Sequence, residues 1–304
     1  MYRILFLGTS EFAVPSLRAL VSDKRFSVLG VVTQPDRPVG RHAIMTAPPI
    51  KTVAQELGLT VFQPETIKEL EANSAFQSLV SDRPDVFVVV SYGKILPQRF
   101  LDIPTKGCVN VHGSLLPRWR GAAPIQAAIA AGDTKSGVTV MQLDAELDHG
   151  AIIGTAEEPI RPDDTGAALH DRLAELGSVI VADQLTGYLD GSITPQEQDH
   201  SQATFCKTMS RDDGKIDWNK SAEEIERMVR AYTPWPGTWT EYEGKRLKIH
   251  KVAIGPKTEN EPGAFFGAER AMYVTCGNGT SVELMTIQRE GGKPIAGNSL
   301  ILPS

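Results

Sequence analysis

The chain has few cysteines and no long hydrophobic segment. Its three cysteines, Cys108, Cys206 and Cys276, are widely spaced and odd in number, which argues against a zinc cluster and for a reducing compartment. No stretch of about 18 apolar residues predicts a membrane span. The apolar run at residues 3–7 is too short for a signal peptide and predicts a first strand. We therefore expect a cytoplasmic protein with no metal centre and no membrane partner.

The chain also lacks an excess of positive charge. Its formal net charge of −6 excludes a nucleic-acid binder that works by bulk charge alone. The acidic excess lies before residue 205, whereas the positive and negative side chains of residues 205–304 nearly balance. The last third of the chain can therefore hold a local contact with a polyanion.

Three familiar motifs are absent as well. Gly8 follows the first predicted strand without the further glycines of a dinucleotide-binding turn, so we do not expect a nicotinamide cofactor. The sequence has no Gly-x-Ser-x-Gly elbow and no paired cysteine nucleophile. These absences argue against a covalent enzyme intermediate, so any group transfer is expected to run directly between two bound substrates.

What the sequence does contain is typical of a globular protein with two domains. A length of 304 residues, with 41% hydrophobic and 22% charged residues, is ordinary for that class. Strand and helix patterns alternate through residues 1–189, which predicts an α/β domain with a doubly wound, mostly parallel sheet. Residues 190–207 are polar and predict a linker. Residues 208–304 hold short strand-like runs at the spacing of a small all-β barrel of the OB type.

Three local predictions come from residue patterns in the first part of the chain. We expect Thr9 or Ser10 to cap a helix over residues 12–21. A proline-punctuated loop is expected over residues 34–49, as either a functional or a mobile, solvated segment. The apolar spacing of residues 64–81 predicts one helix with a polar outer face.

One stretch, residues 107–124, is a short apolar strand followed by a turn rich in proline, arginine and glycine. Side chains two positions apart on a strand share a face, so Asn110 and His112 point the same way, opposite to Val109 and Val111. Two polar groups at the end of an apolar strand cost desolvation energy that packing alone does not recover. Ligands bind at the carboxyl ends of the strands in open α/β sheets. We therefore interpret this stretch as an active site.

A carboxylate from a later loop can complete this site. The amide of Asn110 can donate to a developing oxyanion, and His112 can polarise the same oxygen or move a proton. A carboxylate can orient the imidazole and stabilise its positive charge. Asp148 is our candidate for that role, and the spacing leaves Asp144 and Glu146 open as alternatives.

The same stretch resembles the signature of the folate-dependent formyltransferases, in Asn110-Val111-His112-Gly113-Ser114-Leu115-Leu116-Pro117-Arg118-Trp119-Arg120-Gly121. The resemblance extends along nearly the whole chain, through Phe6-Leu7-Gly8-Thr9, Gln34-Pro35-Asp36-Arg37-Pro38, Leu147-Asp148-His149-Gly150, Ile216-Asp217-Trp218 and Pro234-Trp235-Pro236. The loop and the second domain are similar to those of family members that act on initiator methionyl-tRNA.

This resemblance implies that a formyl group passes from 10-formyltetrahydrofolate to the α-amino group of initiator methionyl-tRNA. Asn110, His112 and Asp148 match the family's catalytic positions. Two further runs match its folate site: Ser114, Leu115, Leu116 and Pro117, which contact the folate, and Tyr92, Gly93, Ile95 and Leu96, which would line the pterin pocket.

The resemblance also implies contacts with the tRNA. The family's loop after the second strand contacts the acceptor end, and Arg41 matches its key arginine. Members often place lysines after that arginine, whereas this chain continues with His42-Ala43-Ile44. We therefore expect further contacts from cations of the second domain, which are Lys207, Lys245, Arg246 and Lys248. We expect the chain to work as a monomer.

Two other functions stay open from the sequence. A folate-dependent formyltransferase could act on the amine of a nucleotide-sugar or of a ribonucleotide. A folate- or RNA-binding module could use the same scaffold without catalysis, although the intact set of Asn110, His112 and Asp148 argues against it.

Overall fold

The computed structural model describes residues 1–40, 42–268 and 270–300. The chain divides into two compact units. The first unit comprises residues 1–121, 136–158 and 170–205, and the second comprises residues 122–135, 159–169 and those from 206 onward. The boundaries of the predicted catalytic domain, linker and barrel domain therefore stay predictions, because each unit is built from several chain segments.

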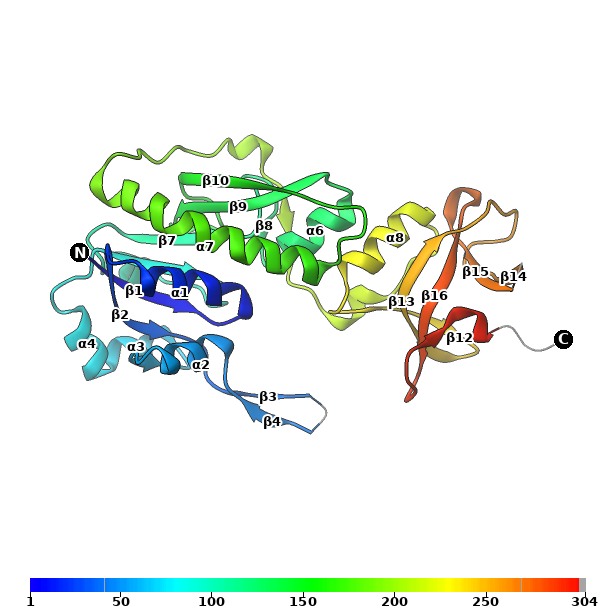
Figure 1. Cartoon of the computed structure of the whole chain (residues 1–304), viewed down its shortest axis with the longest axis horizontal. Helices are drawn as coiled ribbons and strands as arrows, with labels where there is room; N and C mark the ends of the chain where they lie inside the picture. The colour runs from blue at the N-terminus through cyan, green and yellow to red at the C-terminus, as the bar shows by residue number, and fades with distance from the viewer. Residues whose placement is uncertain (41, 269, 301–304) are drawn as a thin grey trace. The chain divides into compact units, whose positions relative to one another are not determined.

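The first unit is built on one seven-stranded sheet, coloured from blue to green in Figure 1. Its strands, in spatial order, are β10 (Ile152–Pro159), β9 (Lys135–Gln142), β7 (Cys108–His112), β6 (Val86–Val90), β1 (Tyr2–Gly8), β2 (Phe26–Val32) and β5 (Val61–Phe62). The pairs from β7 to β5 are parallel, and β9 is antiparallel to β7. The prediction of a doubly wound, mostly parallel sheet is confirmed.

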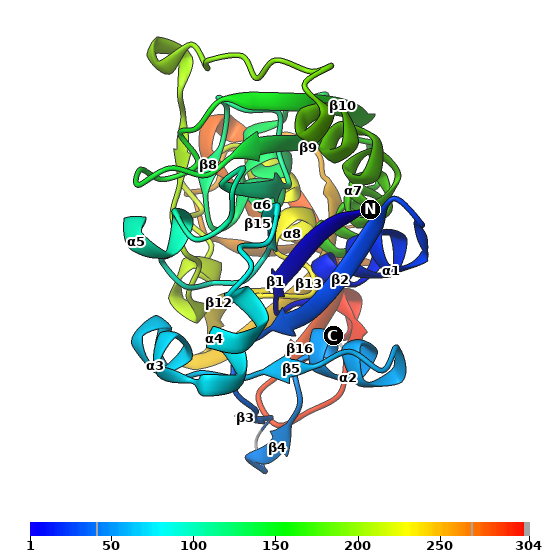
Figure 2. The ribbon, with the colours of Figure 1, turned by 90° about the vertical axis from the view of Figure 1, so that its left-hand side faces the viewer.

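Helices cover both faces of this sheet. They are α1 (Val14–Ser22), α2 (Pro49–Glu56), α3 (Ile67–Ala72), α4 (Ser74–Val80), α5 (Gln98–Leu101) and α7 (Gly166–Asp190). The view along the sheet in Figure 2 shows α1 and α7 on one side and α3 and α5 on the other. On the α7 side, a Cβ added to Gly177 would lie 3.2 Å from Val111. The missing side chain therefore lets α7 approach the middle of β7 closely.

The opposite face holds a buried cluster that reaches the first residue of β7. Its members come from β1, β2, β5, β6, β7 and the short helices α3, α4 and α5, and include Leu7, Phe76, Val89, Phe100 and Cys108. Because side chains alternate along a strand, Asn110 and His112 continue the face that Cys108 begins. This side of β7 therefore changes from core to polar site within five residues.

The predicted cap of the first helix is wrong. A short 3-10 helix, η1 (Glu11–Ala13), precedes α1, and no side chain caps either element. The hydroxyl of Thr9 donates to the carbonyl of Tyr92, and that of Ser10 donates to the hydroxyl of Ser91. These hydroxyls therefore hold the loop after β6, a partner that local sequence does not reveal.

The predicted single helix over residues 64–81 is also wrong, because the chain forms α3 and α4 with a break at Asn73. Asn73 is extended and its side chain accepts from the backbone N–H of Phe76, which caps α4. The predicted loop over residues 34–49 contains a short antiparallel hairpin, β3 (Arg37–Val39) and β4 (Ile44–Thr46). Arg41 lies outside the described residues.

The second unit contains an antiparallel sheet and two helices, α6 (Pro124–Ala131) and α8 (Ala222–Ala231). Its strands are β12 (Thr238–Tyr242), β13 (Lys245–Ile254), β16 (Ser281–Arg289), β15 (Ala271–Thr275) and β14 (Phe265–Ala268), in that spatial order, and β17 (Ile295–Ala296) pairs with β16. The antiparallel sheet confirms a small β domain, and two helices belong to the same unit. In the described residues, β12 and β14 lie at the two ends of the strand order, so closure into a barrel stays a prediction.

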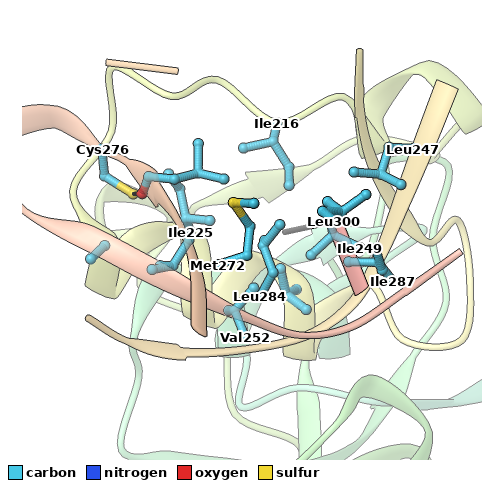
Figure 3. Close-up of a cluster of buried hydrophobic side chains, with 14 residues drawn as sticks. Ile216, Ile225, Leu247, Ile249, Val252, Met272, Cys276, Leu284, Ile287 and Leu300 are labelled. Carbon is cyan, nitrogen blue, oxygen red and sulfur yellow. Dashed lines mark hydrogen bonds between the residues drawn. The ribbon is translucent and has the colours of Figure 1, made fainter. Parts of the chain in front are cut away.

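The apolar face of α8 packs on this sheet. Ile225 and Val229 lie in one buried cluster with Ile249, Val274 and Leu284, several of which are labelled in Figure 3. Burying a side chain of this size contributes roughly 1.5–3 kcal/mol relative to leaving it exposed. The helix starts at a capping box in which Ser221 and Glu224 bond each other's backbone N–H groups.

Short elements complete the chain: β8 (Arg120–Gly121), β11 (Phe205–Cys206), η2 (His200–Gln202), η3 (Arg211–Gly214), η4 (Gly277–Gly279) and η5 (Gly297–Leu300). Among the described residues, no helix has the length and apolar character needed to cross a membrane.

Candidate active site

The site begins at the carboxyl end of β7. His112, the last residue of this strand, is buried, and Asn110 is half-buried on the same face. The chain then turns through Gly113 toward β8, so that the turn folds back over the strand end. The sequence prediction that these two polar side chains share one face of a strand is confirmed.

His112 lies between two hydrogen-bond acceptors. Its Nε2 is 2.9 Å from the carbonyl oxygen of Trp119, and because a carbonyl only accepts, Nε2 carries a proton and donates. Its Nδ1 is 3.7 Å from Oδ2 of Asp148, which is too long for a hydrogen bond but within ion-pair range. A second proton on Nδ1 would therefore give an imidazolium with an acceptor on each side.

Asp148 is the carboxylate that the fold brings to His112. Its Oδ2 accepts from the backbone N–H of Gly121 at 2.7 Å, and its side chain is 12% exposed. Asp144 and Glu146 instead face His149, at 2.7 Å from Nδ1 and 3.9 Å from Nε2. Of the three acids that spacing left open, Asp148 is therefore the one that faces His112, and its catalytic role stays a prediction.

The side-chain amide of Asn110 is free to bind a ligand. In the described part of the chain it makes no hydrogen bond, and it is not fully buried. An amide N–H₂ is a neutral donor suited to an oxygen that gains negative charge. Asn110 therefore offers a donor beside the imidazole of His112, as the sequence predicts.

The run from Ser114 to Pro117 is held by Thr139 of β9. The Thr139 hydroxyl donates to the carbonyl of Ser114 at 2.7 Å and accepts from the N–H of Leu116 at 3.1 Å. Ser114 is buried, and its own hydroxyl donates to the carbonyl of Arg118. A ligand reaching this run would therefore meet Leu115, Pro117 or the backbone before it met the Ser114 side chain, and the folate contacts stay predictions.

The second predicted folate run follows β6. The Tyr92 side chain belongs to the buried cluster, and burial raises its pKa to about 12. Gly93 has a left-handed backbone, and a Cβ there would lie 2.7 Å from Nε2 of Gln34. Ile95 is 92% exposed and Leu96 is half-buried. The backbone of Gly93 and the side chains of Ile95 and Leu96 are therefore the parts of this run that a ligand can reach.

Strained backbone surrounds the site. Ser91 after β6, Trp119 in the turn after β7, and Asp148 all have positive φ, at 49°, 62° and 47°. Such conformations cost free energy for residues other than glycine and persist only where their surroundings hold them. Two of these residues are the partners of His112, so the backbone strain is concentrated where the ring is positioned.

The four cations predicted to contact tRNA are exposed, one at Lys207 and three on β13. Lys207 is exposed and pairs with Asp213. Lys245, Arg246 and Lys248 are exposed on β13, and the guanidinium of Arg246 lies 3.8 Å from the centre of the Trp239 ring. This cation–π contact holds the Arg246 guanidinium at the exposed surface of the sheet. The four residues are accessible, and their contact with tRNA stays a prediction.

The second unit also holds a depression of about 300 Å³ between α6, α8 and residues 213–220. Its lining mixes cations and acids, including Lys215, Lys220, Arg227 and Glu224. None of the predicted site residues lines it. Within residues 1–40, 42–268 and 270–300, no cluster of three histidine, cysteine, aspartate or glutamate side chains has the arrangement of a metal site.

Sequence reasoning missed several residues that build the site. Thr139 holds the turn after β7, and the buried Arg120 and Gln198 bond to each other beside Asp148. A threonine in an apolar strand and a glutamine in a polar segment carry no local signal of such roles. Only the folded chain brings them together.

The sheet order and the polar end of β7 define the class of the protein as a doubly wound α/β fold that carries a candidate active site, together with a small antiparallel β domain. The family model described as "Formyl transferase" matches residues 2–185, and the one described as "Formyl transferase, C-terminal domain" matches residues 208–302. The chain belongs to the formyl transferase family.

Relatives with curated names cover almost the whole chain. Methionyl-tRNA formyltransferase of Marinobacter nauticus is 44% identical over 98% of this chain and 95% of its own length. The protein of the same name from Stutzerimonas stutzeri is 45% identical over 96% of this chain and 92% of its own.

Solved structures with a similar fold are more distant in sequence. The N-formyltransferase from Helicobacter canadensis in complex with folinic acid and dTDP-3-aminofucose has a TM-score of 0.69 at 17% identity, over 93% of this chain and 99% of that one. HypX from Aquifex aeolicus in complex with tetrahydrofolic acid has a TM-score of 0.61 at 17% identity, over 98% of this chain and 46% of that one. At this identity the likeness supports the fold alone.

Proposed function

We propose that this chain transfers the formyl group of 10-formyltetrahydrofolate to the α-amino group of initiator methionyl-tRNA. The class of reaction follows from the formyl transferase family. The acceptor follows from the relatives at 44% and 45% identity, which are named methionyl-tRNA formyltransferase. The proposal includes a monomeric chain that acts in the cytoplasm without a metal ion.

The observation that carries the chemistry is the position of His112. Its ring lies between the carbonyl of Trp119 and the carboxylate of Asp148, and the unpartnered amide of Asn110 lies two residues earlier on the same face of β7. An acceptor facing each nitrogen would stabilise the ring if it gained a second proton during the reaction. A neutral donor and a potential cation on one face suit a reaction in which an oxygen becomes negative.

In the proposed reaction, one bond forms, one bond breaks and one proton moves from the amine side to the folate side. The neutral amine of the methionyl group attacks the formyl carbon, a C–N bond forms, and the formyl oxygen becomes an oxyanion. The bond from the formyl carbon to the folate nitrogen then breaks. The former amine loses a proton and the folate nitrogen gains one, so that formyl-methionyl-tRNA and tetrahydrofolate leave.

Each of the three polar residues has a role in this sequence. Asn110 donates to the oxyanion, and losing one such donor typically costs a factor of about 10² to 10³ in rate. His112 polarises the same oxygen or moves a proton, and any positive charge that its ring gains during the reaction faces Asp148 at Nδ1, because Nε2 already donates to Trp119. Asp148 stabilises that charge and fixes the ring.

The proposed substrate contacts divide between the two predicted domains. Residues 1–189 hold the reaction, with the folate donor beside Ser114, Leu115, Leu116 and Pro117 and beside Tyr92, Gly93, Ile95 and Leu96. Residues 208–304 and the end of the linker bind the tRNA backbone through Lys207, Lys245, Arg246 and Lys248, and Arg41 contacts the acceptor end.

The test is a formylation assay with the acceptors compared side by side. The purified chain is incubated with 10-formyltetrahydrofolate and one of three amines: initiator Met-tRNA, an amino nucleotide-sugar, or a ribonucleotide amine. We expect formyl-methionine on the tRNA and no product on the other two. A product on either small amine, with none on the tRNA, would show that Met-tRNA is not the acceptor. Formyl transfer would still be the reaction.

The catalytic assignment is tested in the same assay with Asn110→Ala and a matched control. Asn260 is an exposed asparagine whose side chain makes no hydrogen bond within the described part of the chain, so Asn260→Ala should leave the rate unchanged. We expect Asn110→Ala to lower kcat by about 10² to 10³ with little change in stability. A kcat within a few-fold of the parent enzyme would contradict the assignment.

A further inference from the structure

The segment of residues 196–204, which we call the strap, is fastened to the first unit at both ends. At its start, the backbones of Gln196 and Ile152 exchange two hydrogen bonds of 2.7 and 2.8 Å. At its end, Thr204 accepts from the backbone N–H of Arg120 through its carbonyl and from that of Trp119 through its hydroxyl, both at 2.9 Å. The strap lies in the polar stretch from which the sequence predicts a linker, so its contacts were not expected.

Gln198 is the buried residue of this strap, 5% exposed. Its Oε1 accepts two hydrogen bonds from the guanidinium of Arg120, at 2.6 Å from Nη2 and 3.2 Å from Nε. Its Nε2 donates to the carbonyls of Asp148 and Gly150, at 3.0 and 2.8 Å. All four contacts use the acceptor and donor ends of one side-chain amide, an arrangement that only glutamine offers at this length.

The two carbonyls that Gln198 holds belong to the loop of Asp148. That residue has a left-handed backbone, at φ 47°, which a non-glycine residue adopts only under external restraint. Gly150 is equally constrained, because a Cβ there would lie 2.1 Å from the carbonyl oxygen of Gln142. The Gln198 amide therefore bridges the two ends of the turn that points the Asp148 carboxylate at His112.

The same strap also holds the other partner of His112. Thr204 accepts from the N–H of Trp119, and the carbonyl of Trp119 accepts from Nε2 of His112. Arg120, which follows Trp119, is bonded to both Gln198 and Nδ1 of His200. The strap is therefore in contact with the backbone on both sides of the imidazole.

We propose that Gln198 is a positioning residue for formyl transfer, acting through Asp148, and that the strap sets the geometry of the His112 ring. This inference rests on the proposed function. A buried polar network in which every group is paired fixes one arrangement of its members, and a partly broken one does not. Gln198 makes the bonds that select the arrangement in which Asp148 faces the ring.

The experiment compares Gln198→Ala with Gln202→Ala. Gln202 is an exposed glutamine of the same strap, and its side chain makes no hydrogen bond to any residue that the structure describes. We expect Gln198→Ala to lower kcat by about 10- to 100-fold, since a misplacement of about 1 Å costs up to that much. The KM values for donor and tRNA should stay within twofold, because Gln198 is not placed in either binding site. Gln202→Ala should match the parent enzyme. A rise in KM at unchanged kcat would overturn the proposal.

A double mutant tests whether Gln198 acts through Asp148. In the Asp148→Ala background, Gln198→Ala should add less than a twofold further loss in single-turnover rate, because the group it positions is gone. If the two losses multiply, Gln198 acts elsewhere and the proposal is wrong. The Asp148→Ala enzyme also distinguishes a failure of the proposed active site from a failure of the positioning role of Gln198. Full activity of that enzyme would refute the proposed site, whereas an impaired Asp148→Ala beside a fully active Gln198→Ala would refute only the positioning role.

Gln198→Glu keeps the test decisive if the alanine variant does not fold. A glutamate retains the oxygen that accepts from Arg120, and so retains that end of the network. Its second carboxylate oxygen replaces the N–H₂ that donates to the carbonyls of Asp148 and Gly150. These two carbonyls then face an oxygen that cannot donate, and both hydrogen bonds are lost. We expect Gln198→Glu to fold with a reduced kcat and unchanged KM values. A glutamate variant with the parent kcat would overturn the proposal.

Discussion

The substitution Asp148→Asn isolates the charge of the proposed carboxylate from its place in the loop. The same oxygen, Oδ2, accepts from the N–H of Gly121 at 2.7 Å and faces Nδ1 of His112 at 3.7 Å. An asparagine can set its amide oxygen in that position and keep the bond to Gly121. What it loses is the negative charge, so any effect on rate reports the charge of His112 in the transition state.

The distance sets the size of the effect. Two unit charges 3.7 Å apart attract by about 1 kcal/mol in bulk water and by about 4 kcal/mol at an effective dielectric constant of about 20. Both side chains are largely buried, 7% and 12% exposed, so the true value lies toward the upper end. We expect the single-turnover rate of formyl transfer to fall by a factor between about 5 and about 10³.

The measurement is the single-turnover rate of formyl transfer to Met-tRNA with saturating donor, together with the KM of the donor. Asp144→Asn is the matched control, because Asp144 is an acid of the same loop that pairs with His149. It should change the rate by less than about twofold, since surface pairs contribute little. A parent rate for Asp148→Asn, or an equal loss of rate in both variants, would show that the charge of Asp148 does not stabilise the transition state.

Three further outcomes are expected. Thr139→Val should lower the free energy of unfolding by roughly 1–3 kcal/mol in urea titrations, because it leaves the buried N–H of Leu116 unpaired, and Thr139→Ser should restore it. Arg246→Ala should raise the KM for tRNA without changing the KM of the donor. It should also reduce the slope of log K for tRNA binding against log salt concentration by about one, as expected for one lost phosphate contact. An unchanged slope would exclude that contact. The hydrogen bond from Lys207 and two hydrogen bonds from Ser210 lower the pKa of Asp213 to about 2 from its ordinary 3.8, so this carboxylate contributes stability above about pH 4 that is lost as the pH falls toward 2. Asp213→Asn should remove that part of the acid dependence, as measured by unfolding at pH 5 and at pH 2.5.

The strand at the centre of the site could be predicted because its signal is local. Alternation along a strand follows from backbone geometry, so the pattern Cys108-Val109-Asn110-Val111-His112 is enough to put the amide and the imidazole on one face. The parallel sheet follows in the same way from buried apolar runs such as Val86–Val90. These predictions need no knowledge of distant residues.

Predictions that depended on competition between partners were less reliable. The hydroxyls of Thr9 and Ser10 have the right chemistry for a helix cap, yet they bond the loop after β6, which offers them nearby partners in the folded chain. The side chain of Asn73 starts a new helix inside a stretch whose apolar spacing predicts one. A short-range pattern indicates which hydrogen bonds a side chain is able to make. Which of these bonds forms depends on the partners that the folded chain brings near it.

The sequence by itself determined the two-domain α/β plan, the strand that carries Asn110 and His112, and the candidate set of three acids, because each depends on the periodicity or spacing of neighbouring residues. Only the tertiary structure decided which acid lies beside His112, and that Gln198 braces the loop behind it. Those contacts join residues far apart in the chain, at separations where no periodic pattern relates one residue to another. They are fixed by the way the strap and the loops close over the end of β7.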